Sequence, residues 1–227
     1  MNKTPPSLIR AFVASVRENG LTNTLQYAST LAYDYYFDLR HGLDTFSWVA
    51  RDALDATPAE SDTASYQPTP VRPLRSLLQH LSLPSGSVLV DFGCGKGRVL
   101  LVASEFAFRE VRGLEYSPGL CRVAEQNCRR YLARCSPDVV FQVLQSDARE
   151  YDIRDDETVF FLFNPFGPEI LRQVIENIQK SLLENPRKAW IVYLNPLHRE
   201  VVKRVSDPSI ERDYEFGGYR FGVFVYD

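Results

Sequence analysis

The chain alternates short apolar runs with longer segments in which apolar residues recur every three or four positions. Short apolar runs bounded by Gly, Pro, Asn or Asp are typical of buried parallel strands. Apolar residues at positions i, i+3, i+4 and i+7 are typical of helices that pack on a core. Beyond about residue 71 the two patterns alternate regularly. They predict an α/β fold with a doubly wound, mostly parallel sheet.

The predicted elements follow in chain order from these patterns. The last two apolar runs flank Gly217-Gly218, which predicts a closing antiparallel hairpin. The expected strands are 88–92, 111–115, 139–145, 158–163, 189–194, 210–216 and 219–225, and the expected helices are 74–81, 98–103, 118–134, 168–184 and 198–205.

The first 65 residues differ from the remainder and are expected to form a helical extension and a linker, ahead of a domain over 66–227. An amphipathic helix is expected over 7–19, and an aromatic-rich helical segment over 24–54. Residues 55–70 are polar and Pro-rich, as linkers are. We expect the N-terminal helices to pack on their own domain or on a second subunit, with contact to a membrane surface as the alternative.

Composition, charge and the placement of cysteine and histidine argue against several classes of function. The 227 residues are 44% hydrophobic, enough for a full core, and their net charge of −3 disfavours a general binder of nucleic-acid phosphates. The four cysteines form no C-x-x-C pair and the three histidines are scattered, so no metal site is expected. The sequence offers no transmembrane stretch and no signal-peptide core, which predicts a cytoplasmic protein.

A glycine-rich turn follows the strand expected at 88–92, with Asp91 ahead of Gly93, Gly95 and Gly97. Such a strand-to-helix turn brings the backbone close to a ligand and directs free N–H groups at it. A dinucleotide fingerprint would need G-x-G-x-x-G, but Arg98 occupies the third glycine's place. The turn therefore predicts a nucleotide-type site and makes an NAD-dependent dehydrogenase the weaker alternative.

Polar groups stand at four successive strand ends, where ligands bind in such sheets. Asp91 ends the first strand. Glu115 ends the second, and a carboxylate there can accept both hydroxyls of a ribose. Asp147 ends the third, within reach of an adenine amino group, and the motif 164–166 ends the fourth. Together these positions predict a nucleoside-bearing ligand.

The G-x-G-x-G turn with its preceding aspartate resembles the glycine motif of seven-strand S-adenosylmethionine (SAM) methyltransferases, over about Tyr66 to Asp227. The D-x-G-x-G-K-G-R run, G-x-E-x-S-P and the Tyr66-x-Pro-Thr-Pro loop together resemble a bacterial group of mostly unassigned substrate. They are loosely similar to non-SET protein-lysine methyltransferases. The resemblance implies that SAM is held by Tyr66, Thr69, Asp91, Gly93, Cys94, Gly95, Gly97, Glu115, Tyr116, Asp147, Ala148 and Asn164.

Asn164-Pro165-Phe166 is similar to the D/N-P-P-Y/F motif of amino-group methyltransferases, but has one proline rather than two. The resemblance implies that the Asn164 side chain and the Pro165 carbonyl accept hydrogen bonds from the target N–H. Phe166 or Tyr66 would then form the pocket wall. It implies methyl transfer to a protein side chain or small molecule, at nitrogen. The alternatives are a nucleic-acid amino-methyltransferase and a non-catalytic SAM-binding module.

Overall fold

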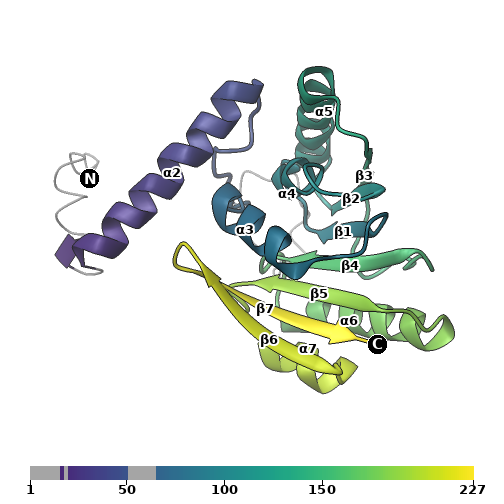
Figure 1. The fold of residues 1–227 in the computed structure, drawn as a ribbon. Helices are drawn as coiled ribbons and strands as arrows, with labels where there is room; N and C mark the ends of the chain where they lie inside the picture. The colour runs from purple at the N-terminus through teal and green to yellow at the C-terminus, as the bar shows by residue number, and fades with distance from the viewer. Residues whose placement is uncertain (1–15, 18–19, 51–64) are drawn as a thin grey trace, which may run out of the picture.

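The computed structural model describes residues 16–17, 20–50 and 65–227. Its centre is a seven-stranded sheet of order β3-β2-β1-β4-β5-β7-β6 (Figure 1). The strands from β3 to β5 are parallel, and β7 runs antiparallel to both of its neighbours. The strands are β1 (Val88–Phe92), β2 (Glu110–Glu115), β3 (Val140–Gln145), β4 (Glu157–Leu162), β5 (Ala189–Leu194), β6 (Ile210–Phe216) and β7 (Tyr219–Tyr226).

Helices cover both faces of the sheet, as the doubly wound prediction requires (Figure 1). Successive strand residues serve opposite faces, so Leu89 joins the apolar cluster under α3–α5 and Val90 joins the cluster under α6 and α7. Besides the helical residues 16 and 17, the helices of the described ranges are α2 (Leu21–His41), α3 (Val71–Leu81), α4 (Arg98–Ala103), α5 (Pro118–Cys135), α6 (Pro168–Glu184) and α7 (Arg199–Ser206).

The strand order positions the site. The chain moves outward from β1 through β2 to β3, then returns to place β4 on the other side of β1. The carboxyl ends of β1 and β4 therefore lie side by side at the point where the order reverses, which is where open α/β sheets bind ligands. The predicted seven-strand fold with its terminal hairpin is confirmed.

The prediction of helix over 24–54 is wrong beyond His41. Gly42 adopts φ 67°, a left-handed conformation that ends α2. The Asp38 carboxylate then accepts hydrogen bonds from the backbone N–H groups of Thr45 and Phe46, which turns the chain back. The chain continues to Val49, which forms an isolated antiparallel bridge with Tyr66. The helix expected over 7–19 lies outside the described residues, except for helical residues 16 and 17.

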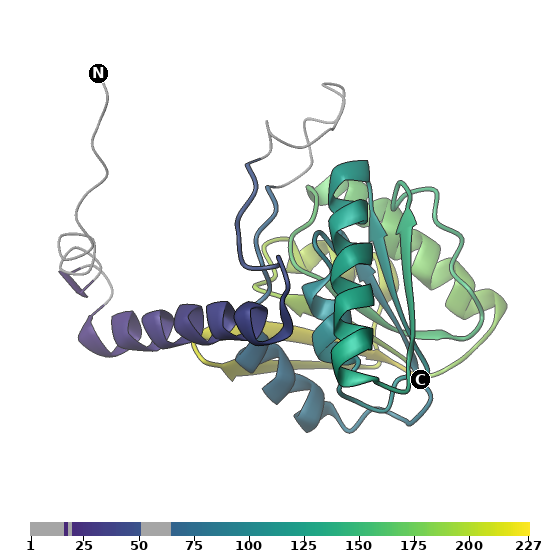
Figure 2. The same ribbon diagram turned by 90° about the horizontal axis from the view of Figure 1, so that it is seen from above.

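The long helix α2 stands at the edge of the domain, and its N-terminal end reaches beyond the sheet and its covering helices (Figure 2). Its C-terminal half packs against the domain through Phe37, which joins the apolar cluster under α3–α5. Among the described helices, none has both the length and the apolar character needed to cross a bilayer.

Candidate active site

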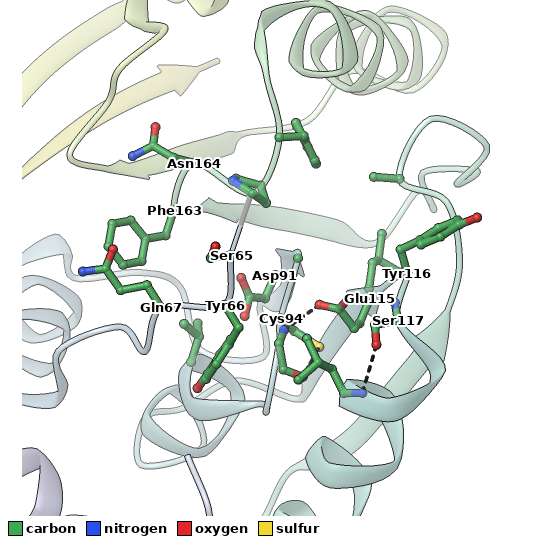
Figure 3. Close-up of a pocket in the computed structure, with 18 of the residues that line it drawn as sticks. Ser65, Tyr66, Gln67, Asp91, Cys94, Glu115, Tyr116, Ser117, Phe163 and Asn164 are labelled. Atoms are coloured by element: carbon green, nitrogen blue, oxygen red, sulfur yellow. Dashed lines mark hydrogen bonds between the residues drawn. The ribbon is translucent and has the colours of Figure 1, made fainter. Parts of the chain in front are cut away.

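A cavity of about 400 Å³ opens at the carboxyl ends of β1, β2 and β4 (Figure 3). The structure brings together around it nearly all the residues predicted from sequence. These are Tyr66, Thr69, Asp91, Gly93, Cys94, Gly95, Glu115, Tyr116, Asp147, Ala148, Asn164, Pro165 and Phe166.

Gly97 is the one predicted site residue that does not line the cavity. It has φ 85° and begins α4 as its N-cap. A Cβ built on it would lie 3.3 Å from the Ala124 side chain of α5. Gly97 therefore permits a tight turn against α5, and the prediction that it contacts the ligand has no support in its position.

The glycine turn uses its backbone N–H groups within the protein. Gly93 N and Cys94 N both donate to the Leu114 carbonyl, at 2.9 Å each, and Gly95 N donates to Glu115 Oε2 at 2.9 Å. The expectation that free N–H groups point at the ligand is wrong for these three positions. These three amides are therefore not available to a phosphate group of a ligand.

Glycine is required at the turn because other segments press against it. Gly93 has φ 76°, and a Cβ there would lie 2.4 Å from Pro165. Gly95 has φ 55°, and a Cβ there would lie 2.2 Å from the ring of Tyr66. The turn is thus held between the Tyr66 loop and the Asn164-Pro165-Phe166 motif, so the two motifs found in the sequence are in direct contact with it.

Glu115 is oriented by two backbone amides. Its Oε1 accepts from Ser117 N and its Oε2 from Gly95 N, both at 2.9 Å. Each carboxylate oxygen can accept about two hydrogen bonds, so one acceptor position remains on each. Burial raises the pKa of Glu115. The remaining acceptor capacity suits neighbouring hydroxyl groups, and the contact of Glu115 with a ribose stays a prediction.

Asp91 is the buried acid at the centre of the site, between Glu115 and the side of the cavity formed by Phe163 (Figure 3). Its side chain is 3% exposed, and no side chain in the described part of the protein hydrogen-bonds to it. Burial, and then the charge of Glu115, raise the pKa of Asp91 well above its ordinary value. A ligand cation would relieve this cost, because a buried charge is stable only when paired.

The cationic side chains that line the cavity already have acidic partners. Arg98 pairs with Asp34 at 2.9 Å. Arg149 donates from its Nε to both carboxylate oxygens of Asp147, at 3.0 Å each. Hydrogen bonding from Arg149 lowers the pKa of Asp147. The contact of Asp147 with an adenine amino group stays a prediction, and its carboxylate would have to share its lone pairs with Arg149.

Asn164 adopts φ 46°, and its side chain is directed away from Asp91 toward the turn after β5 (Figure 3). Its Oδ1 accepts from Tyr193 OH at 2.7 Å and from Leu197 N at 3.3 Å, while its Nδ2 donates to the Asn195 carbonyl at 2.9 Å. Both lone pairs of the amide oxygen are thereby used. The expected free acceptor on the Asn164 side chain is absent from this arrangement, and the side chain instead fixes the turn that carries Leu197.

Tyr66 presents its ring to the glycine turn but not its hydroxyl to the cavity. The hydroxyl donates to the Thr45 carbonyl at 2.8 Å, and burial raises its pKa. The backbone of Tyr66 is held by its bridge to Val49. Tyr66 can therefore form a wall of the pocket, as one reading of the sequence expected, whereas its hydroxyl is already occupied.

Sequence analysis missed the residues at the mouth of the cavity. Trp48 and Leu197 line it while remaining 60% and 74% exposed. Trp48 belongs to the aromatic-rich segment 24–54. Leu197 follows Asn195-Pro196 just as Phe166 follows Asn164-Pro165, and both asparagines have positive φ. That repeated Asn-Pro pair after successive strands was the available signal.

Arg98, used in the sequence only to exclude a dinucleotide motif, anchors the N-terminal extension. It is 1% exposed and reaches Asp34 at 2.9 Å, Asp38 at 3.4 Å and Thr45 Oγ1 at 2.7 Å. It also donates to the Thr69 carbonyl at 3.4 Å. One side chain therefore joins the helix after the glycine turn to α2, to the segment after it and to the Tyr66 loop.

No group of three or more His, Cys, Asp or Glu side chains in the described ranges gathers in a way that could hold a metal ion. The cavity instead holds two carboxylates, Asp91 and Glu115, with which no arginine of those ranges forms an ion pair. This donor set suits an organic cation that carries hydroxyl groups.

Comparison with known proteins agrees with this geometry. Residues 90–165 match a family model described as a methyltransferase domain. The matched residues run from β1 to the Asn164-Pro165 turn and so span Asp91, Glu115 and Asp147. A search among curated proteins returned no match.

Solved structures share the fold at low sequence identity. An RNA methyltransferase from Salinibacter ruber, in complex with S-adenosyl-L-homocysteine, is 22% identical with a TM-score of 0.51, over 71% of this chain and 93% of that one. A ribosomal protein L11 methylase from Lactobacillus delbrueckii subsp. bulgaricus is 15% identical, with a TM-score of 0.50 over 68% and 77%. A putative O-methyltransferase from Nostoc punctiforme is 14% identical, with a TM-score of 0.54 over 68% and 55%. These three differ in acceptor, so the shared fold leaves the acceptor open.

Proposed function

We propose that this chain, which is a SAM-dependent methyltransferase, transfers a methyl group to a nitrogen of a protein side chain or small-molecule acceptor. The acceptor would enter between Trp48 and Leu197, the exposed apolar residues at the mouth of the cavity. The observation that carries the proposal is the chemistry of this mouth, which is apolar and where both lining arginines of the described ranges are paired with acids.

The cavity fits the cofactor. Asp91 offers a buried carboxylate without a partner among the described side chains, which suits the amino group of the methionine end. Glu115 offers one acceptor position on each oxygen, which suits the two ribose hydroxyls. Tyr66 and Phe166 supply apolar walls that exclude water from the space between them. When bound, SAM supplies a methyl group that its sulfonium has already activated.

The mouth favours an acceptor without phosphates. A nucleic-acid substrate is recognised largely through phosphate contacts from Lys and Arg. The lining arginines, Arg98 and Arg149, are paired with Asp34 and Asp147 instead. An aromatic ring and an aliphatic side chain at the entrance suit an acceptor that brings its own apolar surface.

Transfer requires alignment more than acid–base chemistry. The acceptor nitrogen must arrive with a free lone pair, so it loses its proton to solvent before or during transfer. The N–C bond forms as the C–S bond breaks, and the products are the methylated acceptor and S-adenosylhomocysteine. The Pro165 carbonyl would accept a hydrogen bond from the acceptor N–H, and Phe166 would form a wall of the pocket beside the acceptor. Asn164 would position the turn that carries Leu197. Such alignment can account for a large part of the rate.

The first test measures transfer of labelled methyl from SAM into a cell extract by the full-length protein. We expect label either in macromolecules from which protease releases it or in solvent-extractable small molecules. Label that resists protease but is released by nuclease would overturn the proposal in favour of nucleic acid. Cofactor binding without any incorporation in extracts of several growth states would instead favour the non-catalytic module.

A matched pair of variants tests the entrance. Leu197→Ser should raise KM for the acceptor about tenfold while leaving cofactor affinity unchanged, since removing a large apolar contact costs about 1.5 kcal/mol. Leu183→Ser is the control, because Leu183 is equally exposed, at 74%, but lies on α6 away from the cavity. Equal effects of the two substitutions would contradict the assignment of the mouth.

A further inference from the structure

The helix α2 is amphipathic in the reverse of the usual sense. Its domain-facing side buries the polar residues Thr24, Thr30, Asp34 and Asp38. Seven large apolar side chains of this helix nevertheless remain between 37% and 67% exposed: Leu21, Leu25, Tyr27, Leu31, Tyr35, Tyr36 and Leu39. Five of the seven lie on the side that faces away from the domain. Exposed apolar surface of this extent on one element marks an interaction site.

The apolar residues include a stripe with regular spacing. At 100° per residue, six apolar residues of the helix, two of which are alanines, fall within about 40° of one line along the helix. This line lies on the side that faces away from the domain. The spacing of the six residues is four, three, four, three and four, which is the heptad spacing of a helix that packs against another helix. The stripe consists of Leu21, Leu25, Ala28, Ala32, Tyr35 and Leu39.

The stripe is also symmetric about position 30. Leu21 and Leu39 are equally distant from this point, as are Leu25 and Tyr35, and the two small residues Ala28 and Ala32. A two-fold axis at position 30 would therefore place large residues against large residues at both ends. It would place the alanines against each other at the centre, where they let two backbones approach. An isologous contact requires this self-complementarity.

We propose that α2 pairs with α2 of a second copy of this chain in antiparallel register, with Leu21 facing the partner's Leu39. In this register each pair of facing residues combines an a position of one helix with a d position of the other, as is usual when antiparallel helices pack. The four large side chains of the stripe and the adjacent Tyr36 present on the order of 100 Å² each, or roughly 500 Å² per protomer. Two protomers would therefore bury roughly 1,000 Å² in total, which is the lower limit for a specific interface.

The surroundings of the stripe favour a protein partner over a membrane. A helix that lies on a membrane surface needs Lys or Arg along its polar side. On the exposed side of α2 the only charged residue is Arg40, since Asp34 and Asp38 are buried. In both views the N-terminal end of α2 extends beyond the sheet and its covering helices (Figures 1 and 2).

The proposal is tested by the mass of the full-length protein in solution, measured by light scattering during size-exclusion chromatography. We expect a dimer, and we expect the double variant Leu25→Glu/Leu39→Glu to be a monomer with unchanged helix content and cofactor affinity. Leu183→Glu is the matched control on α6 and should remain dimeric. A monomeric parent protein, or a dimer that the double variant leaves intact, would overturn the proposal.

Cysteine cross-linking tests the register. In a Cys135→Ser background, which removes the exposed native thiol, chains with Leu21→Cys are mixed with chains carrying Leu39→Cys and oxidised. Mixed disulfides should form, and Leu21→Cys alone should not cross-link to itself. Self-cross-linking would indicate a parallel pair and overturn the register.

Two other occupants of the stripe are distinguishable. A parent protein that is monomeric and sediments with anionic vesicles, but not after Leu25→Glu/Leu39→Glu, would assign the stripe to a membrane. A monomer that becomes a dimer after Ile9→Glu/Phe12→Glu would assign it to the chain's own N-terminal residues. Either result would replace the second copy as the occupant.

Discussion

Buried carboxylates lie on two sides of the same glycine turn. Those on one side are paired with a cation, and the one on the other side is not. On the side of α2, Asp34 and Asp38 share the guanidinium of Arg98. On the side of the cavity, Asp91 has no such partner among the described residues. A buried acid that is paired contributes to the architecture, whereas one left unpaired costs stability until a ligand neutralises it. The contrast separates the structural cluster from the binding site.

Removing the shared cation should give the largest effect. Arg98→Met leaves two buried carboxylates without their partner, and breaking such a pair costs about 3–5 kcal/mol. We expect the free energy of unfolding, measured with urea, to fall by that amount. Adding Asp34→Asn and Asp38→Asn should restore part of the loss. A loss below about 1 kcal/mol would show that the Arg98 cluster is not a buried ion-pair network.

Removing the ribose acceptor should weaken the cofactor without unfolding the protein. Glu115→Ala should reduce SAM affinity by about 1.5–3 kcal/mol, the range for a hydrogen bond to a charged group. Isothermal titration calorimetry measures this, with Glu184→Ala on the exposed side of α6 as the control. Unchanged affinity in Glu115→Ala would contradict the ribose assignment.

Asp91, the unpaired acid, should lower the stability of the free protein and strengthen its binding of SAM. The folded-state pKa of Asp91 is raised, so its contribution to stability is present below the unfolded pKa and is lost as the pH rises through the folded pKa. Asp91→Asn removes this loss. We expect it to stabilise the free protein by about 1 kcal/mol near pH 8 and to weaken SAM binding tenfold or more. Destabilisation near pH 8 would mean that Asp91 has a partner in solution.

The same raised pKa predicts how cofactor binding depends on pH. The carboxylate of Asp91 must be ionised to pair with the cofactor's ammonium, so affinity should be full above its raised pKa and decline as the pH falls through it. Binding at a pH below that raised pKa should also release a proton, detectable by calorimetry in buffers of different ionisation enthalpy. Asp91→Asn should abolish both effects, and a pH-independent affinity in the parent protein would contradict the assignment.

The smallest effect should come from the turn that carries Leu197. Asn164→Ala should lower kcat/KM with little change in SAM affinity, because the side chain holds the turn rather than the cofactor. Tyr193→Phe removes one of the two donors to Asn164 Oδ1 and should cost about 1 kcal/mol in kcat/KM. Equal loss of SAM affinity would make Asn164 a cofactor-binding residue instead.

Local sequence patterns were sufficient to predict the sheet and the part of the site that lies on it. Periodicity fixed each strand and helix from α3 to β7 closely, because each element's own residues decide which face is buried. Parallel strands deliver their carboxyl ends to one edge, so Asp91, Glu115, Asp147 and the 164–166 motif had to meet there.

Which of these groups are available to a ligand depends instead on contacts between elements that are distant in the sequence. Hydrogen bonds between distant residues occupy the Asn164 amide, the Tyr66 hydroxyl and the amides of the glycine turn. The role of Arg98 likewise depends on Asp34, which lies 64 residues earlier in the chain. Local patterns place residues on faces and edges, but the pairing of side chains across the fold depends on packing between elements that no local pattern encodes.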